Sequence, residues 1–181
     1  LGIPGEAEYY GRGVHYCATC DGAFYRGRRL AVVGGGNSAV QEALFLTRFA
    51  SHIDLLVRSK LRASEVLQRE LDKAVSDGHI TVHLETIPEA VIASDGSMVN
   101  ALRVRCGDTT KELPVDGVFV FIGLLPNTGF LKGSGVALDD IGMVITDKNL
   151  MTNVSGVFAS GDVRSGATAQ IASAVGEGAT A

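Results

Sequence analysis

Residues 29–39 read Arg-Leu-Ala-Val-Val-Gly-Gly-Gly-Asn-Ser-Ala, and this stretch decides the fold. The apolar, β-branched run from 29 to 33 is typical of a strand that is buried on both faces of a parallel sheet. Gly34 permits a tight turn after that strand, and Gly36 lets the backbone approach a pyrophosphate. Ala39 is small enough for the following helix to pack closely on the strand.

A helix is expected directly after the glycines, because the apolar residues there recur at helical spacing: Val40, Ala43, Leu44, Leu46 and Ala50. Its first N–H groups and its dipole would face the phosphates of a dinucleotide. An ordinary glycine-rich turn between a strand and a helix is the alternative. We favour the phosphate cradle, with these candidate cofactor-binding residues: Gly34, Gly36, Asn37, Ser38 and Ala39.

The second strand of the unit is predicted at residues 53–57, and the residues directly after it indicate the cofactor. An NAD site has a carboxylate about 20 residues after the glycines, where it binds the ribose 2′-hydroxyl. This chain instead has the basic run 58–62, Arg-Ser-Lys-Leu-Arg. Because guanidinium groups bind a 2′-phosphate in a bidentate, charge-assisted way, we predict NADPH with Arg58 and Arg62 as phosphate ligands. Lys60 is a weaker candidate, since a basic residue in an exposed loop is often only solvated.

A Cys-x-x-Cys pair, Cys17 and Cys20, lies a few residues upstream of the first strand. The pair could be half of a zinc site, but His15, two residues before Cys17, does not complete a tetrahedral set of ligands. A structural disulfide across three residues would close too small a loop to stabilise much. Redox cycling remains, since one thiolate can attack a disulfide and its neighbour can resolve the mixed species.

Asp21 follows the thiol pair directly and could donate a proton to a departing thiolate, although it could equally be a turn residue before Gly22. Cys106 lies in a polar stretch and is expected to be an incidental thiol. Together, a nicotinamide site and a redox-competent thiol pair predict a disulfide reductase.

Three motifs resemble bacterial thioredoxin reductase of the low-molecular-weight type, and the similarity extends over essentially the whole chain. The motifs are Tyr-Cys-Ala-Thr-Cys-Asp-Gly at 16–22, Val-Val-Gly-Gly-Gly-Asn-Ser-Ala at 32–39 and Gly-Val-Phe-Ala-Ser-Gly-Asp-Val at 156–163. In that family an NADPH domain carries the redox disulfide, which faces a flavin held by a separate FAD domain.

The resemblance implies a role for each matching residue. Cys17 and Cys20 would form the active disulfide, and Asp21 would be the acid that protonates the reduced flavin–thiol system. The Gly161-Asp162 pair corresponds to the aspartate that binds the ribityl chain of FAD. Residues 170–172, which are Gln170, Ile171 and Ala172, fall where the family lines the flavin ring.

The sequence departs from the family pattern at two places. The family has His-Arg-Arg and a further Arg where this chain has Val57-Arg58-Ser59 and Arg62, so two of three guanidinium groups remain. Ala169 replaces a basic residue that many members carry before the glutamine near the flavin. A weaker preference for NADPH over NADH is the expected effect of the first change.

We expect two domains, residues 1–122 as the NADPH-binding domain and residues 123–181 as the C-terminal part of an FAD-binding domain. The N-terminal FAD half is expected to be missing, so the fragment alone is expected to be inactive. The fold class is α/β, a Rossmann-like doubly wound parallel sheet with an antiparallel hairpin crossover, plus part of the second domain. A linker is predicted at 124–129.

Patterning between the motifs supplies the remaining predicted elements. A helix is predicted at 65–75, with these residues on one apolar face: Val66, Leu67, Leu71, Ala74 and Val75. A strand at 80–84 comes next, then a hairpin with strands at 98–105 and 111–115, then a buried parallel-type strand at 118–122.

Composition limits the partners. The chain has 181 residues and a formal charge of −4 without basic blocks, which argues against nucleic acid. Its apolar runs are too short to span a membrane. Three cysteines, one of them without an obvious partner, fit a reducing compartment, so a cytoplasmic location is expected. No metal site is predicted.

The expected function is NADPH-dependent, FAD-mediated reduction of a protein disulfide through Cys17 and Cys20. By resemblance the substrate would be a thioredoxin-like protein, and the intact enzyme a homodimer. Two alternatives remain. One is a related flavoprotein of the alkyl hydroperoxide reductase type, against which Arg58 and Arg62 speak. The other is an inert nicotinamide-binding module without turnover.

Overall fold

The structure is a computed structural model, and it describes residues 1–123 and 125–181. The chain divides into two compact units, Leu1–Ile122 and Gly123–Ala181. Leu124, the first residue of the predicted linker 124–129, lies outside the described residues.

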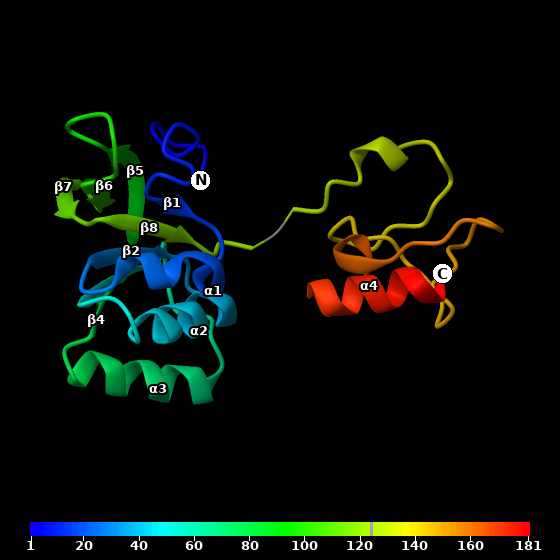
Figure 1. The fold of residues 1–181 in the computed structure, drawn as a ribbon, viewed down its shortest axis with the longest axis horizontal. Coiled ribbons are helices and arrows are strands. Elements are labelled where there is room, and N and C mark those ends of the chain that lie inside the picture. The colour runs from blue at the N-terminus through cyan, green and yellow to red at the C-terminus, as the bar shows by residue number, and fades with distance from the viewer. Residues whose placement is uncertain (124) are drawn as a thin grey trace. The chain divides into compact units, whose positions relative to one another are not determined.

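A five-stranded parallel sheet forms the centre of the first unit (Figure 1). The strand order is β1-β8-β2-β3-β4. The bounds are β1 Val14–His15, β2 Arg29–Val33, β3 His52–Leu56, β4 Ile80–His83 and β8 Gly117–Val120. The predicted strands at 29–33, 53–57, 80–84 and 118–122 are confirmed to within two residues at each end. Strand β1 was not predicted, because two residues are too few for a periodic signal.

Helices cover one face of this sheet (Figure 1). They are α1 Ala18–Asp21, the 3-10 helix η1 Gly22–Tyr25, α2 Asn37–Leu46 and α3 Glu65–Ser76. The core beneath them contains alternate residues of the strands, among them Leu30, Val32, Ile53 and Leu55, all fully buried. The expected apolar face of α3 is partly wrong. Leu71 and Ala74 are buried, but Val66 is 65 % exposed and Val75 is 40 % exposed.

An antiparallel three-stranded sheet covers the other face, in the order β5-β6-β7. Its bounds are β5 Thr86–Ile92, β6 Ala101–Cys106 and β7 Thr109–Pro114. The predicted hairpin is therefore confirmed as β6 and β7, while β5 is an addition. Pro88 lies inside β5 at a register irregularity between Pro88 and Ala90. A proline is tolerated there because β5 is an edge strand and the pairing is interrupted at that point.

A buried carboxylate ties three of the parallel strands together. Asp54 of β3 is 1 % exposed and accepts hydrogen bonds from Arg29 Nε at 2.9 Å and from Arg29 Nη2 at 3.2 Å. His83 Nε2 of β4 lies 2.7 Å from Oδ1 of the same carboxylate. Burial by itself would raise the pKa of Asp54, but the hydrogen bonds from His83 and Arg29 outweigh it and hold the pKa below its usual value.

The parallel arrangement brings the predicted functional segments to one edge of the sheet. Parallel strands all end on the same side, so the segments after β1, β2 and β3 leave from that edge. The segment after β1 carries the thiol pair, the one after β2 the glycines, and the one after β3 the basic run. Sequence order alone does not give this convergence; it depends on the strand order.

The second unit contains short elements. They are the 3-10 helices η2 Gly129–Leu131 and η3 Gly161–Val163, and the helix α4 Ile171–Thr180. Isolated bridges such as Leu138 with Val144 and Met151 with Phe158 hold the intervening loops. Among the helices of the described residues, none has the length and apolar character needed to cross a bilayer.

Candidate functional site: a disulfide beside a glycine loop

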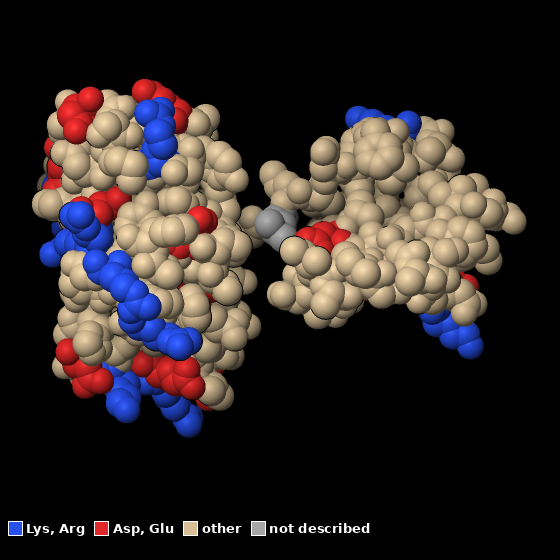
Figure 2. Space-filling model, viewed as in Figure 1, with Lys and Arg blue, Asp and Glu red and all other residues tan. Residues whose placement is uncertain are grey.

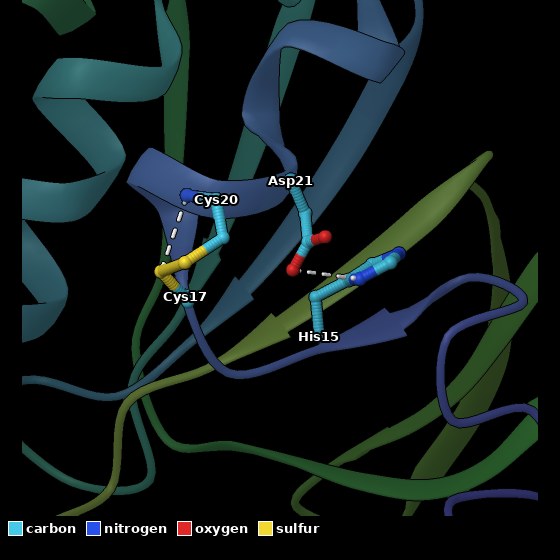
Figure 3. Close-up of a disulfide and its surroundings, with 4 residues drawn as sticks. All are labelled: His15, Cys17, Cys20 and Asp21. Carbon is cyan, nitrogen blue, oxygen red and sulfur yellow. Dashed lines mark hydrogen bonds and ion pairs between the residues drawn. A yellow bond between two sulfur atoms is a disulfide. The ribbon is translucent and has the colours of Figure 1, made fainter.

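Cys17 and Cys20 form a disulfide at the start of α1, with their Cα atoms 5.3 Å apart (Figure 3). Cys17 is the N-cap of this short helix, and its Sγ accepts a hydrogen bond from the Cys20 N–H at 3.1 Å. Cys20 is exposed, whereas Cys17 is partly buried. Cys106 is free and exposed at the end of β6.

No group of three His, Cys, Asp or Glu side chains in the described part of the chain lies close enough to hold a metal ion. The pair in this structure is closed as a disulfide, and one of its two residues, Cys20, is exposed to a reaction partner. This arrangement suits thiol–disulfide exchange, which needs access to one sulfur.

Asp21, the last residue of α1, points toward His15 (Figure 3). Its Oδ2 lies 3.1 Å from His15 Nδ1, and its side chain is 30 % exposed. The opposite ring nitrogen, His15 Nε2, lies 2.6 Å from the Tyr25 hydroxyl. Burial, together with the charges of Asp21 and Asp116, raises the pKa of Tyr25 to about 12.

His15 and Tyr25 were not predicted as site residues. Nothing in the local spacing of the sequence links His15 to Tyr25. The signal in the sequence is weak: a histidine placed two positions before Cys17, in a stretch with no helical period. Because β1 lies next to β8, Phe119 packs against the His15 ring with centroids 5.1 Å apart, and Tyr25 packs against Phe119 as well, at 5.6 Å.

The glycine loop after β2 has the geometry of a phosphate cradle. Gly34 has φ +145°, and a Cβ there would lie 2.3 Å from the Phe121 carbonyl oxygen and 2.7 Å from Ala39 Cβ. A Cβ at Gly36 would meet nothing within 4 Å, so the backbone there is open to an approaching group. Gly36 is also the N-cap of α2 and provides no side-chain bond to the first-turn N–H groups. Asn37 and Ser38 are at least partly exposed in that first turn. An anion can bind at such a helix start.

The segment 58–64 after β3 is tied to the glycine loop and to the first residue of α2 by two hydrogen bonds. Arg62 N–H donates to the Gly35 carbonyl at 2.7 Å, and Ser64 N–H donates to Asn37 Oδ1 at 2.8 Å. The side chains of Arg58 and Arg62 are exposed. Within the described residues, neither guanidinium group forms an ion pair with a carboxylate. The backbone of Arg62 is therefore attached to the glycine loop, and the two guanidinium groups are exposed and without an ion-pair partner among the described residues.

Charges of both signs are spread over the visible face of the first unit (Figure 2). A band of Lys and Arg side chains crosses this face, and acidic side chains lie around it.

The second unit carries the remaining predicted residues. Gly161, with φ +73°, begins η3, and Asp162 beside it is exposed. Glu177 of α4 pairs with Arg164 and accepts a hydrogen bond from Gly161 N–H at 2.7 Å, so its pKa lies below its usual value. This pairing fixes the start of η3 against α4. Gln170 is the N-cap of α4, and the first residues of that helix include the exposed Ile171, with Ala172 next to it.

The pyridine nucleotide-disulphide oxidoreductase family model matches residues 1–178. Thioredoxin reductase of Listeria monocytogenes is 42 % identical over 183 residues, which is 100 % of this chain and 56 % of that protein. An alkyl hydroperoxide reductase polypeptide of Pseudomonas putida is 45 % identical over 184 residues, covering 100 % of this chain and 34 % of that protein.

Among solved structures, Lactococcus lactis thioredoxin reductase in its FR conformation has a TM-score of 0.79 and 40 % identity. The match covers 100 % of this chain and 59 % of that one. The chain thus spans little more than half the length of the thioredoxin reductases to which it is similar.

Proposed function

This chain belongs to the pyridine nucleotide-disulphide oxidoreductase family, and on that premise we propose that it serves NADPH-dependent, FAD-mediated reduction of a protein disulfide. The observation that carries the proposal is the Cys17–Cys20 disulfide at the same sheet edge as the glycine loop. Redox chemistry and nicotinamide binding then share one scaffold.

NADPH is proposed to bind with its pyrophosphate at the start of α2 and its 2′-phosphate at the basic run. The open backbone at Gly36 and the uncapped first turn, which includes Ser38, suit the pyrophosphate. Arg58 and Arg62 supply the guanidinium groups that distinguish a 2′-phosphate from a hydroxyl.

FAD is proposed to contact the second unit at the exposed Asp162 and at the start of α4, around Gln170. When bound, NADPH and FAD would together supply two electrons to the disulfide. The residues of this chain then have to protonate the sulfur atoms that result. Opening the S–S bond with two electrons leaves two sulfur anions, which take up two protons to become thiols. Asp21 is proposed to provide one of these protons.

A thioredoxin-like protein is the proposed substrate. Thioredoxin reductases from several organisms are similar to this chain over its whole length. An exposed aromatic ring, Phe24, lies four residues after Cys20 and is 81 % exposed. An exposed apolar ring in the segment that follows the redox disulfide could contact the apolar surface of a protein substrate.

The flavoprotein component of an alkyl hydroperoxide reductase is the second candidate, because the Pseudomonas putida polypeptide of that name is equally similar in sequence. The two candidates differ in the protein that accepts electrons. They share the nicotinamide site and the disulfide, so both depend on Cys17 and Cys20.

The test uses the full-length protein loaded with FAD. NADPH oxidation is followed with thioredoxin, and separately with the peroxidase component of an alkyl hydroperoxide reductase system, as acceptor. Cys17→Ser and Cys20→Ser should each abolish turnover, and Cys106→Ser, which removes the free exposed thiol, should not. Turnover that survives the loss of Cys17 or Cys20 would contradict the proposal. Turnover with the peroxidase component alone would favour the second candidate.

A further inference from the structure

His15 is a buried imidazole with both ring nitrogens engaged. It is 7 % exposed and lies at the end of β1, between the carboxylate of Asp21 and the hydroxyl of Tyr25. Its ring stacks on Phe119, and Tyr25 meets it edge to face at a centroid distance of 5.3 Å. The ring is therefore held in one orientation by contacts on two sides.

Tyr25 determines which nitrogen of His15 carries the proton. Because the pKa of Tyr25 is raised to about 12, its hydroxyl stays protonated at neutral pH and can donate to His15 Nε2. The neutral imidazole then carries its proton on Nδ1, which faces Asp21 Oδ2 at 3.1 Å. The result is a directed chain, from the Tyr25 hydroxyl through His15 to the Asp21 carboxylate.

We infer that His15 is a positioning residue for Asp21, and that Tyr25 fixes the tautomer of His15 for this role. The inference rests on the proposed function, in which Asp21 gives a proton to one sulfur when the disulfide opens. When bound, the nicotinamide and the flavin would supply the two electrons that break the S–S bond. Asp21 faces His15 through Oδ2, so the proton that it gives to one sulfur anion is carried on its other carboxyl oxygen, Oδ1. Solvent supplies the second proton and later restores the first.

Few charged groups lie near the hydrogen-bonded series of Tyr25, His15 and Asp21. A cavity of about 360 Å³ opens beside His15 and Tyr25, and Arg28 and Asp116 also line it. These two form an ion pair at 3.3 Å. The cavity gives water access to Tyr25, at one end of the hydrogen-bonded series. Asp21, at the other end, lies on the helix that carries the disulfide (Figure 3).

A purely structural role is the competing explanation, since removing any buried, hydrogen-bonded histidine can destabilise a protein. His83 supplies the matched control. Its Nε2 lies 2.7 Å from a carboxylate, that of Asp54, in the same parallel sheet but without contact to the disulfide segment. Replacement of His83 should therefore lower stability without changing thiol chemistry.

The experiment measures alkylation of the reduced thiols as a function of pH, in the full-length protein with a Cys106→Ser background. His15→Leu should move the pH midpoint of alkylation by about half a unit or more, because the carboxylate of Asp21, directly after the thiol pair on α1, is no longer held. Tyr25→Phe should cause a smaller shift. His15→Asn, whose amide can replace the Nδ1 donor, should restore most of the wild-type midpoint. His83→Leu should leave it unchanged.

Turnover of the FAD-loaded protein gives the second readout. His15→Leu should lower kcat about tenfold, as expected for a misplaced general acid, with the KM for the protein substrate unchanged. Thermal unfolding of each variant distinguishes loss of the fold from misplacement of the Asp21 carboxyl. If His15→Leu does not fold, Tyr25→Phe and His15→Asn still test the inference.

Equal alkylation midpoints in His15→Leu, Tyr25→Phe and wild type would overturn the inference. So would a shift of the same size in His83→Leu. If the wild-type protein reduces no protein disulfide but the alkylation midpoints shift as expected, the proposed function fails and the positioning of Asp21 stands. Alkylation decides the inference without flavin, so the two failures are distinguishable.

Discussion

Replacing both Arg58 and Arg62 with alanine should weaken NADPH binding far more than NADH binding. Both side chains are exposed, and among the described residues neither forms an ion pair with a carboxylate. Each can therefore donate to a 2′-phosphate without first breaking another bond. A hydrogen bond to a charged group contributes about 1.5 kcal/mol at the lower end of its range, which is the appropriate end for an exposed site. Two such contacts contribute about 3 kcal/mol, or about 150-fold in Kd.

The measurement is calorimetric titration of wild type and double variant with NADPH and with NADH. Salt provides an internal check, because exposed charges are screened, so the preference for NADPH should fall as ionic strength rises. Arg69→Ala is the matched control. It removes an exposed arginine of the neighbouring helix α3, which pairs with Glu65 at 3.8 Å. That variant should bind both nucleotides like wild type.

Two results would refute this reasoning. Equal affinity of the wild-type protein for NADPH and NADH would show that the arginines do not recognise the 2′-phosphate. An equal loss of NADH and NADPH binding in the double variant would show that they bind a part common to both cofactors.

Four further substitutions have defined expectations. Gly34→Ala should destabilise the protein by about 2–4 kcal/mol in urea unfolding, because its Cβ would lie 2.3 Å from the Phe121 carbonyl oxygen at a positive φ. Gly36→Ala, with open space around its Cβ, should leave stability unchanged but weaken NADPH binding in calorimetry. A larger loss of stability in Gly36→Ala than in Gly34→Ala would contradict the cradle geometry. Asp54→Ala should lower the free energy of unfolding by about 2–3 kcal/mol, somewhat below the range for fully buried pairs because one partner reaches solvent. Since the folded pKa of the Asp54 carboxyl is lowered from 3.8, its contribution to stability is present above about pH 4 and is lost as the pH falls further. The stability of the wild type should therefore fall more steeply with acid than that of Asp54→Ala, and equal slopes would contradict this prediction. Phe24→Ala should raise the KM for a thioredoxin-like substrate several-fold with kcat unchanged in steady-state assays, and an unaltered KM would exclude a docking role for this ring.

The parts of the fold that sequence predicts well are those with a long, regular pattern. The run from Arg29 to Ala39 determines a strand, a turn and a helix by local rules, and the structure has all three. Val66 shows the limit of helical periodicity. It is apolar and adjacent to the buried stripe of α3, yet only the tertiary packing decides that it faces outward. Strand β5 was not predicted because it contains Pro88, and a proline normally argues against a strand.

The candidate site divides in the same way. Cys17, Cys20 and the glycines belong to compact motifs, so their positions follow from neighbours in the chain. The stacking of Phe119 on His15 depends instead on β1 pairing with β8, whose residues lie about a hundred positions further along the sequence. A pairing across that distance has no local signal, and a two-residue strand gives no periodicity from which to infer it.

The two hydrogen bonds between the glycine loop and the basic run have a consequence for redesign of coenzyme preference. The donors are the backbone N–H groups of residues 62 and 64, so the loop keeps its shape whatever side chains it carries there, provided that neither is proline. Exchange of Arg58 and Arg62 for acidic or neutral residues should then convert the protein toward NADH without rebuilding the loop. Asn37 is the side chain that such a redesign has to retain, because its carboxamide oxygen is the acceptor for Ser64.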